Sequence, residues 1–538
     1  MEAPPKMASA DSEHILQLLA SEEPPTGQQM LDFSVKIKAS IHSTNVHEFT
    51  AMVLNNIPVF DARSPGEFAL GHIPGANNLP LFSDDERASV GTLFNTSGRA
   101  NAMVSGMAIV QPKLDTLVAT AATALNGGTI MLLHCWRGGM RSCALAFLMQ
   151  TRIPGLRVHV LKGGYKAFRA WQRSVYCYLP MNASYDASQD VSLSSFSSSG
   201  FSGGGGKRKR KSKQKETNAR LKRAAREASA SGVGIARREA AIAKARAQRG
   251  EEDAKEMAAA KIKFEKLVED EKIKKNEWNI NYKPGPTIVI IGGRTGSGKT
   301  KVLHALRDVL GEQVIDLEGT ANHSGSAFGF VGHTSQPTPQ QFTNMVAMEW
   351  ASLDPERWVF VEDEGPNIGR VSTPVGLYRL MRASSIVLKL NVTKNVRVQV
   401  LREDYAVPEK RSEGGGEGGE GGEVEKKEEE QWLSSMIQAT RTLEKRIGRV
   451  RMEAMILLLQ SGNYAEFAST ALEYYDDLYD RHISNEHGSA NMREGMSSGS
   501  VRTAAIRVVN VVETAEKFDA VAVAQQVLMV LEGTKRGK

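Results

Sequence analysis

The chain has 538 residues, of which 41% are hydrophobic and 24% charged, so it holds enough apolar sequence for two or three domains with separate cores. Its apolar runs all fall short of the roughly 18–20 residues that a membrane-spanning helix needs, so we expect no membrane partner. The formal net charge of +7 is uneven, because residues 207–275 hold 23 Lys and Arg against 11 Asp and Glu and therefore carry +12.

Residues 1–40 begin with MEAPPKMASADSEHILQLL, which lacks the basic and apolar blocks of a targeting peptide. We expect this segment to be poorly ordered. The chain has three cysteines, Cys135, Cys143 and Cys177, which are too few and too scattered for a disulfide framework or a CxxC metal pair. These features favour a reducing, cytoplasmic location, with an organelle or the nucleus left open.

Residues 41–181 alternate between short apolar runs and helical stretches. The runs at 57–63, 129–135 and 156–164 are predicted to be strands, and MRSCALAFLMQ at 140–150 is predicted to be a helix. Strands that alternate with helices form parallel sheets, so this region is predicted to be an α/β domain.

A cysteine loop, HCWRGGMRS at 134–142, joins one of these strands to the helix. Backbone N–H groups at the start of the helix, together with Arg137 and Arg141, would stabilise a thiolate on Cys135 and attract an oxyanion. The two glycines give the loop the freedom that a curled anion cradle needs. The loop therefore predicts three catalytic residues, Cys135, Arg137 and Arg141; a buried structural thiol is the plainer alternative.

Residues 182–282 form an insertion in two parts. A stretch containing SLSSFSSSGFSGGGG is predicted to be a flexible linker, and the basic, alanine-rich stretch after it is predicted to be long exposed helix. The concentrated positive charge favours contacts with nucleic-acid phosphates, although a solvated spacer explains the same pattern.

A glycine-rich loop, GRTGSGKT, opens a second α/β region at residues 283–405. It fits the G-x-x-x-x-G-K-[ST] pattern and stands between a predicted strand and a predicted helix, which indicates a diphosphate cradle. Lys299 would add charge to the diphosphate and Thr300 would hold Mg²⁺. The whole predicted loop consists of Gly293, Arg294, Thr295, Gly296, Ser297, Gly298, Lys299 and Thr300.

Three more residues are candidates for this second site. The apolar run WVFVEDEG delivers Glu362 and Asp363, which we predict to bind Mg²⁺ at the carboxyl edge of the sheet. His323 stands in a glycine-rich loop and is predicted to contact a ligand, or equally to be structural.

The acidic, glycine-rich residues 406–430 are predicted to be a flexible insertion, and residues 431–538 a helical C-terminal part.

Several segments resemble one family. FDARSPGEFALGHIPGANNLPL and the cysteine loop are similar to rhodanese-type domains, and the C-x5-R spacing resembles the longer loops of rhodanese-fold phosphatases. With LFSDDERASVGTLFNTSGRANAMVSG, DLEGTANHSGSAFG, VEDEGPNIGR and ALEYYDDLYD added, the chain resembles the tRNA 2-selenouridine synthase family. The resemblance implies an α/β fold with an N-terminal rhodanese-like parallel-sheet domain, a P-loop NTPase-like domain with a helical C-terminal part, and long low-complexity insertions.

The resemblance also implies a function. Members of this family are transferases that replace the sulfur of wobble 2-thiouridine with selenium through an S-geranyl intermediate. The implied co-substrates are selenophosphate at the cysteine loop and geranyl diphosphate at the P-loop, with Mg²⁺. The implied partners are the tRNAs for Lys, Glu and Gln, and selenophosphate synthetase. Cys135 would either carry selenium or help to expel phosphate.

Two other classes of function stay open at this point. The chain is also compatible with a rhodanese-fold phosphatase, or with a nucleotide-binding regulator whose rhodanese domain serves for docking. Phosphate release from a phosphorylated substrate would favour the first, and ATP or GTP binding with an idle Cys135 would favour the second. Within the family, a member without selenophosphate would only geranylate its tRNA.

Overall fold

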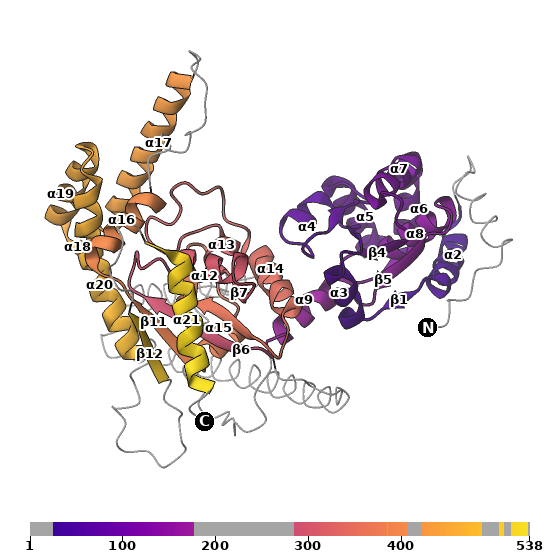
Figure 1. The fold of residues 1–538 in the computed structure, drawn as a ribbon. Helices are drawn as coiled ribbons and strands as arrows, with labels where there is room; N and C mark the ends of the chain where they lie inside the picture. Colours follow the sequence, from indigo (N-terminus) through magenta and orange to yellow (C-terminus); the bar gives the residue numbers. More distant parts are fainter. Residues whose placement is uncertain are drawn as a thin grey trace, which may run out of the picture. The chain divides into compact units, whose positions relative to one another are not determined.

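The computed structural model describes residues 25–176, 285–384, 386–405, 421–486, 505–510 and 518–535 (Figure 1). These residues contain two five-stranded parallel sheets covered by helices, and one two-stranded antiparallel hairpin. The predicted α/β class is confirmed. None of the helices in these ranges is long and apolar enough to cross a membrane.

The first sheet consists of β1 (Ser43–Thr44), β2 (Val59–Asp61), β3 (Asn77–Asn78), β4 (Ile130–His134) and β5 (Arg157–Leu161). Their spatial order is β1-β5-β4-β2-β3, and every neighbouring pair is parallel. The run IMLL in the central strand β4 is apolar without alternation, as expected for a strand that is buried on both sides. The carboxyl ends of β2 and β4 are therefore neighbours at one edge of the sheet.

Two apolar layers cover this sheet, and successive side chains of β4 enter them in turn. Met131 and Leu133 belong to one core and Leu132 to the other. The first layer includes α2 (Gly27–Ser40), α5 (Asp84–Thr96), α6 (Gly98–Val110), α7 (Leu114–Leu125) and α8 (Met140–Arg152); the second includes α3 (Val46–Leu54) and α9 (Gly164–Ser174). The short elements α4 (Pro65–Ala69) and η1 (Gln111–Lys113) complete the region.

The prediction that residues 1–40 are poorly ordered is wrong for residues 27–40, which form α2. Thr26 and Gln29 make a capping box at its start. Three apolar side chains recur at helical spacing and are buried against the first core: Met30, Phe33 and Ile37. This stripe is short, and the helix is stabilised by burial more than by its sequence pattern. Residues 1–24 lie outside the described residues.

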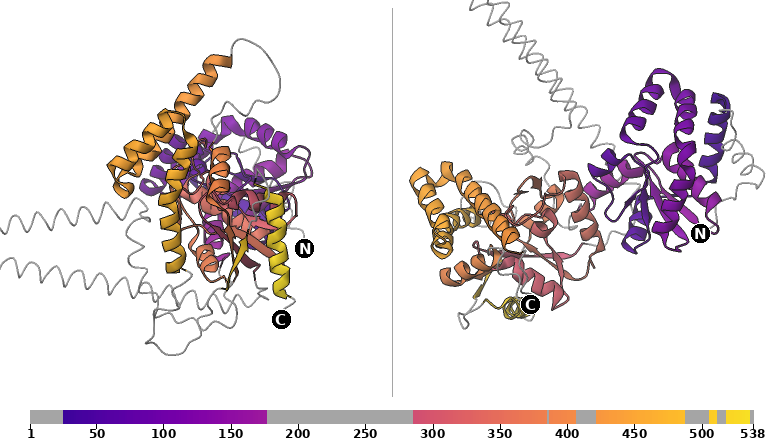
Figure 2. Two further views of the ribbon diagram at one scale, coloured as in Figure 1. Left: turned by 60° about the vertical axis from the view of Figure 1, so that its left-hand side comes forward. Right: turned by 90° about the horizontal axis from the view of Figure 1, so that it is seen from above.

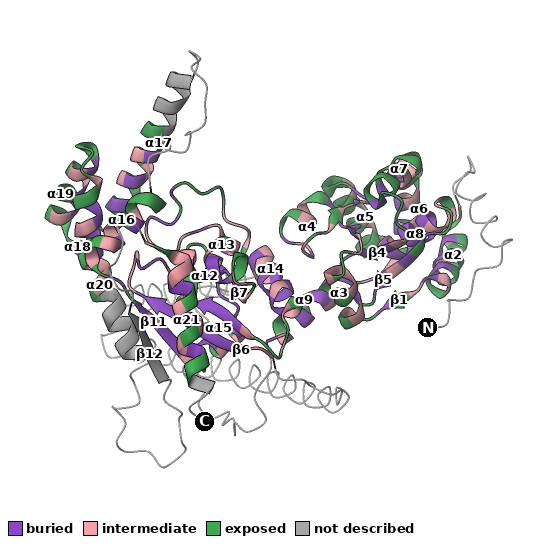
Figure 3. Ribbon diagram, viewed as in Figure 1, coloured by how far each residue is buried: buried purple, intermediate pink, exposed green. Residues whose placement is uncertain are grey.

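The second sheet consists of β6 (Thr287–Gly293), β7 (Gln313–Ile315), β8 (Trp358–Glu362), β11 (Ile386–Asn391) and β12 (Ala505–Asn510). Their order is β12-β11-β6-β8-β7, again with every pair parallel. Figure 3 shows the strands of the sheet interior as largely buried. The strand β12 was not predicted. It lies in the part expected to be only helical, and it pairs with β11 along its whole length.

Helices pack on this sheet. On one face, α12 (Lys299–Asp308) and α21 (Ala520–Lys535) share a core through Val302, Leu306, Val523 and Val527. Figure 2 shows α21 in yellow beside the second sheet. The remaining elements are α13 (Leu317–Ala321), α14 (Pro339–Ser352), the hairpin of β9 (Asn367–Ile368) and β10 (Val371–Ser372), α15 (Val375–Arg382) and α16 (Lys394–Asp404). After α16 the chain leaves the second sheet for a long helical excursion, and it returns to the sheet with β12 and α21.

That excursion consists of α17 (Gly421–Thr442), α18 (Glu444–Ile447), α19 (Arg449–Gln460) and α20 (Tyr464–Glu486). Within the predicted helical part that begins at residue 431, Gly448 has a φ of 83° and separates α18 from α19. The predicted flexible insertion 406–430 is partly wrong, because α17 begins at Gly421. The run VEKKEEEQ consists of strong helix formers, and α17 continues through it. Residues 406–420 and the whole insertion 182–282 lie outside the described residues.

Candidate functional site

The cysteine loop lies between the end of β4 and the start of α8. The side chain of Cys135 is 3% exposed. The N–H of Gly139 donates a hydrogen bond to its sulfur at 3.3 Å, and the hydroxyl of Ser142 lies 3.2 Å from the sulfur. Gly138 has a φ of 64°, and a Cβ there would lie 2.6 Å from the carbonyl oxygen of Leu161. The loop is therefore curled around the sulfur, and only glycine fits the turn.

Arg141 lines the same cavity as Cys135 and is held by an acid from another element. Its Nη1 lies 2.7 Å from Oε2 of Glu67, which belongs to α4. Burial alone would lower the pKa of Arg141, but Glu67 and then Cys135 outweigh it and the pKa is raised. Arg137 is exposed, and all three predicted residues of this site line one cavity with Trp136.

Below the loop lies a buried polar cluster that the sequence analysis missed. Nε of Arg63 donates to Oδ2 of Asp61 at 2.8 Å, and the guanidinium lies 3.9 Å from the ring centre of Tyr165. Nδ1 of His134 is 3.6 Å from Oδ1 of Asp61. Burial lowers the pKa of His134 to about 4, so the imidazole is neutral at physiological pH. The FDAR motif, with its charged pair at a strand end, was the available signal.

The P-loop connects β6 to α12. Gly296 and Gly298 both have a φ of 76°, and a Cβ on Gly298 would lie 2.4 Å from the ring of Phe518. Nζ of Lys299 donates to the carbonyl oxygen of Gly293 at 3.3 Å, so the lysine folds back over its own loop. Of the other predicted loop residues, Arg294 and Thr295 are partly buried, and Ser297 is buried.

An ion pair from distant helices supports the loop from below. Arg397 of α16 is 2% exposed and makes two hydrogen bonds of 2.7 Å to Asp476 of α20. Its Nη1 also donates to the carbonyl oxygen of Thr295 at 3.2 Å. Asp476 belongs to the ALEYYDDLYD segment, so one acid of that segment positions the P-loop through Arg397.

We expect Asp476→Asn to lower the free energy of unfolding by about 3 kcal/mol, because it leaves the buried guanidinium of Arg397 without its counter-charge. Urea unfolding of the full chain, followed by tryptophan fluorescence, measures the change. Glu430→Gln, which neutralises an exposed carboxylate on α17, is the control and should change the free energy by less than about 0.5 kcal/mol. Equal effects of the two substitutions would contradict the assigned role of the pair.

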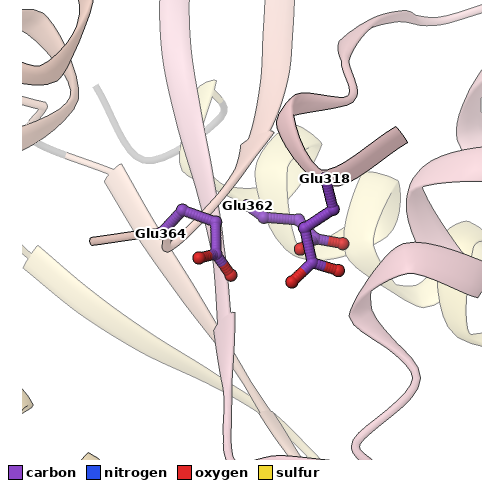
Figure 4. Close-up of side chains that lie close together, drawn as sticks. All are labelled: Glu318, Glu362 and Glu364. Carbon is purple, nitrogen blue, oxygen red and sulfur yellow. The ribbon is translucent and has the colours of Figure 1, made fainter. Parts of the chain in front are cut away.

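Three carboxylates from two elements meet beside the P-loop (Figure 4). Glu318 of α13, Glu362 at the end of β8 and Glu364 just after it each offer an oxygen, and these oxygens lie within 4.8 Å of one another. Glu362 is 1% exposed, and its two carboxylate oxygens make no hydrogen bond to another described residue. Oγ1 of Thr300 lies 3.4 Å from Oε2 of Glu318. A set of oxygen donors with unused buried lone pairs fits a hard divalent cation.

The predicted cation ligands are only partly the ones that the structure brings together. Glu362 and Thr300 lie at the cluster, but Asp363 makes an ion pair of 2.6 Å with Arg382 instead. Successive residues at a strand end face opposite sides, so Glu362 and Glu364 share a side and Asp363 does not. Glu318, in the DLEG segment, and Glu364 were missed by the sequence analysis.

Charge is unbalanced in this cluster. Burial, and then the neighbouring Glu362, raise the pKa of Glu364 to about 7. Burial also raises the pKa of Glu318 and of Glu362. Burial alone would lower the pKa of Lys299, but the surrounding carboxylates, Glu362 first, outweigh it and raise that pKa. Lys299 thus stays protonated and partly neutralises the acids.

We expect the affinity of this cluster for Mn²⁺, used as a probe for Mg²⁺, to rise with pH through about 7, because all three carboxylates have raised pKa values. A proton and the cation compete for Glu364 below its raised pKa. Each pH unit below 7 should weaken binding by about tenfold, if one proton is released. Electron paramagnetic resonance of free Mn²⁺ measures the affinity.

In this titration Glu364→Gln should weaken binding and flatten its pH dependence. Glu466→Gln, at an exposed position on α20, should leave both unchanged. An affinity that is independent of pH in the unsubstituted chain would contradict the assignment of Glu364.

His323 follows α13 directly, and its backbone N–H donates to the carbonyl oxygen of Glu318 at 3.1 Å. The side chain is 7% exposed, and its Nδ1 has no hydrogen-bond partner among the described residues. Burial lowers its pKa, so the imidazole is neutral. The backbone of His323 therefore contacts Glu318 of the acidic cluster, but among the described residues no hydrogen bond joins its imidazole to the three carboxylates.

Comparison with known proteins identifies both regions. Residues 45–170 match the family model of the rhodanese-like domain, and residues 286–504 match that of the tRNA 2-selenouridine synthase AAA domain. Three relatives carry the name tRNA 2-selenouridine synthase. The relative from Sulfurovum is 28% identical, and the match covers 81% of this chain and 91% of the relative. The relative from Hydrogenovibrio crunogenus is 27% identical, with 80% of this chain and 91% of the relative covered. The relative from Pseudomonas putida strain GB-1 is 26% identical, with 80% of this chain and 89% of the relative covered.

Proposed function

The chain belongs to the tRNA 2-selenouridine synthase family, and on this premise we propose that it is a transferase that exchanges the sulfur of wobble 2-thiouridine in tRNA for selenium. One observation carries the proposal: a single chain holds a P-loop beside three clustered carboxylates and a cysteine loop with two arginines. The first suits chemistry on a diphosphate and the second suits chemistry on a phosphorylated donor. The inferred tRNA substrates are those for Lys, Glu and Gln.

In the first reaction the thiocarbonyl sulfur attacks C1 of geranyl diphosphate. A C–S bond forms, the C–O bond breaks, and diphosphate leaves with the electron pair, while the base loses its N3 proton. Alkylation is needed because sulfur is otherwise a poor leaving group from the ring. We place the diphosphate in the P-loop, where backbone N–H groups and Lys299 stabilise its charge as it departs.

Glu318, Glu362 and Glu364, with Thr300, would hold Mg²⁺, which would supply further positive charge to the diphosphate. Residues of the protein also prepare the P-loop for the diphosphate independently of Mg²⁺. The ion pair of Arg397 and Asp476 fixes the backbone of the loop, and the carboxylates keep Lys299 protonated. These contacts preorganise the cradle before the substrate arrives.

In the second reaction the selenium of selenophosphate attacks C2 of the geranylated base. A C–Se bond forms, the C–S bond breaks, and geranylthiolate leaves. The thiolate of Cys135 then attacks phosphorus, so that the Se–P electron pair stays on selenium and the base regains its N3 proton. Water hydrolyses the phosphocysteine to inorganic phosphate and restores the thiolate. Arg137 and Arg141 pair with the phosphate oxygens throughout.

The alternative role of Cys135, attack on selenium itself, does not balance with the reactants at hand. It would leave phosphorus as phosphite and would put selenium on Cys135 in a form that needs a reductant for its release. Attack on phosphorus needs only water, and a curled loop with an arginine suits a phosphoryl group. We therefore assign Cys135 to phosphoryl transfer.

The proposed function is tested by nucleoside analysis. The purified chain is incubated with thiolated tRNA, geranyl diphosphate and Mg²⁺, with and without selenophosphate, and the digested nucleosides are identified by mass. We expect S-geranyl-2-thiouridine without selenophosphate and 2-selenouridine with it. If no nucleoside changes mass under either condition, the proposed function is wrong, and release of phosphate from phosphorylated substrates becomes the next assay.

A further inference from the structure

An apolar cavity of about 810 Å³ opens beside the cysteine loop. This volume is typical of sites for small organic ligands, which usually fall between about 300 and 1,000 Å³. Its walls come from α2, α5, α6 and α8, and most of the side chains that line it are apolar, including Phe33, Phe82, Met103, Met107 and Phe147. The cavity is far larger and more apolar than selenophosphate requires.

The lining of the cavity is not uniformly apolar. Cys135, Arg137 and Arg141 line it together with Trp136, which is 38% exposed, and Phe94, which is 54% exposed. Arg87 and Arg99 line it as well, so the cavity combines many apolar side chains with a nucleophilic thiol and several cationic groups. Such a site suits a ligand with a polar or anionic reacting end and an apolar chain.

We propose that this cavity receives the geranyl chain of the S-geranyl-2-thiouridine intermediate. The inference rests on the proposed function, in which the geranyl group is the one extended apolar part of any reactant. When the geranyl chain occupies the cavity, the sulfur bonded to it lies beside the cysteine loop. C2 of the base, which carries this sulfur, is then presented to the same loop. When the C–S bond breaks, the electron pair goes to sulfur, and the geranylthiolate stays in the cavity, apart from the selenium.

This assignment gives the geranyl group a second use. In the first reaction it makes sulfur a leaving group. In the second reaction its binding in the cavity positions the base at the cysteine loop. A thiolated tRNA has no geranyl group to bind there, so the second site would select geranylated tRNA over its precursor. The order of the two reactions would then follow from apolar burial.

Gly91 of α5 offers a way to fill the cavity without disturbing the fold. It lines the cavity, and a Cβ built on it meets no atom within 4 Å. Replacing a helical glycine also favours the helix. Ser89 is exposed on the same helix and does not line the cavity, so it is the matched control.

The experiment measures binding of two labelled anticodon stem-loop RNAs to the full chain by fluorescence anisotropy, one with S-geranyl-2-thiouridine and one with 2-thiouridine. The unsubstituted chain should bind the geranylated RNA more tightly, by roughly tenfold or more. Gly91→Phe should abolish this preference and Gly91→Leu should reduce it, while both still bind the thiolated RNA as before. Ser89→Phe should keep the preference.

A preference for the geranylated RNA that survives in Gly91→Phe overturns the proposal, because the geranyl group would then be bound elsewhere. Equal binding of the two RNAs by the unsubstituted protein also overturns it. Circular dichroism of both glycine variants shows whether they fold, and Gly91→Leu serves if the larger substitution does not. The nucleoside analysis with thiolated tRNA runs in parallel. If it yields no geranylated product, the proposed function has failed; if it does and the preference is absent, only the cavity assignment has failed.

Discussion

Lys299→Ala is expected to leave tRNA at 2-thiouridine, with geranylation slowed by about 10²–10³-fold. Lys299 is the cation that the P-loop adds to its backbone donors, and it folds over the loop at Gly293 in the free protein. Without it the departing diphosphate loses a positive charge while the three carboxylates remain. The measurement is the initial rate of S-geranyl-2-thiouridine formation, by mass, with selenophosphate left out.

Lys301→Ala is the matched control for this substitution. Lys301 stands two residues further along α12, where it pairs with Glu403 and Asp404 rather than with the loop. Its removal should change the rate by less than about threefold. If Lys299→Ala geranylates at the rate of the unsubstituted chain, the diphosphate does not bind at the P-loop. S-geranylated tRNA supplied to Lys299→Ala should still be converted to 2-selenouridine.

Cys135→Ser is expected to have the opposite pattern. Geranylation should proceed, S-geranyl-2-thiouridine should accumulate, and formation of 2-selenouridine should fall by about 10³-fold or more, as for loss of a nucleophile. The displacement at C2 is reversible until the phosphoryl group is removed, so the geranylated base is the species that persists. The nucleosides are measured by mass after incubation with all reactants.

Cys143→Ala is the control for this second substitution. Cys143 is a buried thiol in α8, the helix that follows the cysteine loop. Burial raises its pKa to about 11, so it is not a nucleophile at physiological pH. Its removal should leave selenation nearly unchanged. If Cys135→Ser makes 2-selenouridine at the normal rate, Cys135 takes no part in the reaction and its assignment to phosphoryl transfer is wrong.

The elements that the sequence predicted best are those with a complete local pattern. The strand before the cysteine loop is a continuous apolar run, and the P-loop has a fixed spacing between a strand and a helix, so both are found where they were expected. The helix α2 was missed because its stability comes from burial of a short stripe against α8. The strand β12 was missed because its pairing partner β11 is more than a hundred residues away in the chain.

The candidate sites show the same division. Cys135, Arg141 and the P-loop residues could be found from motifs, since each motif is contiguous. The third carboxylate of the acidic cluster could not be found in this way, because Glu318 approaches Glu362 only in the fold. Asp363 was chosen over Glu364 because sequence adjacency does not show which side of a strand end a residue faces. The cavity beside Cys135 is assembled from several helices and loops that are far apart in the sequence, so it leaves no local signature.

The central claim is that one chain carries two separate reactions at two sites, joined by a geranylated tRNA. A mixing experiment tests it most directly. Lys299→Ala and Cys135→Ser proteins are incubated together with thiolated tRNA, geranyl diphosphate, Mg²⁺ and selenophosphate, and the nucleosides are identified by mass. Neither variant alone should make 2-selenouridine, and the mixture should make it. A mixture that accumulates S-geranyl-2-thiouridine without forming any 2-selenouridine would contradict the two-site account.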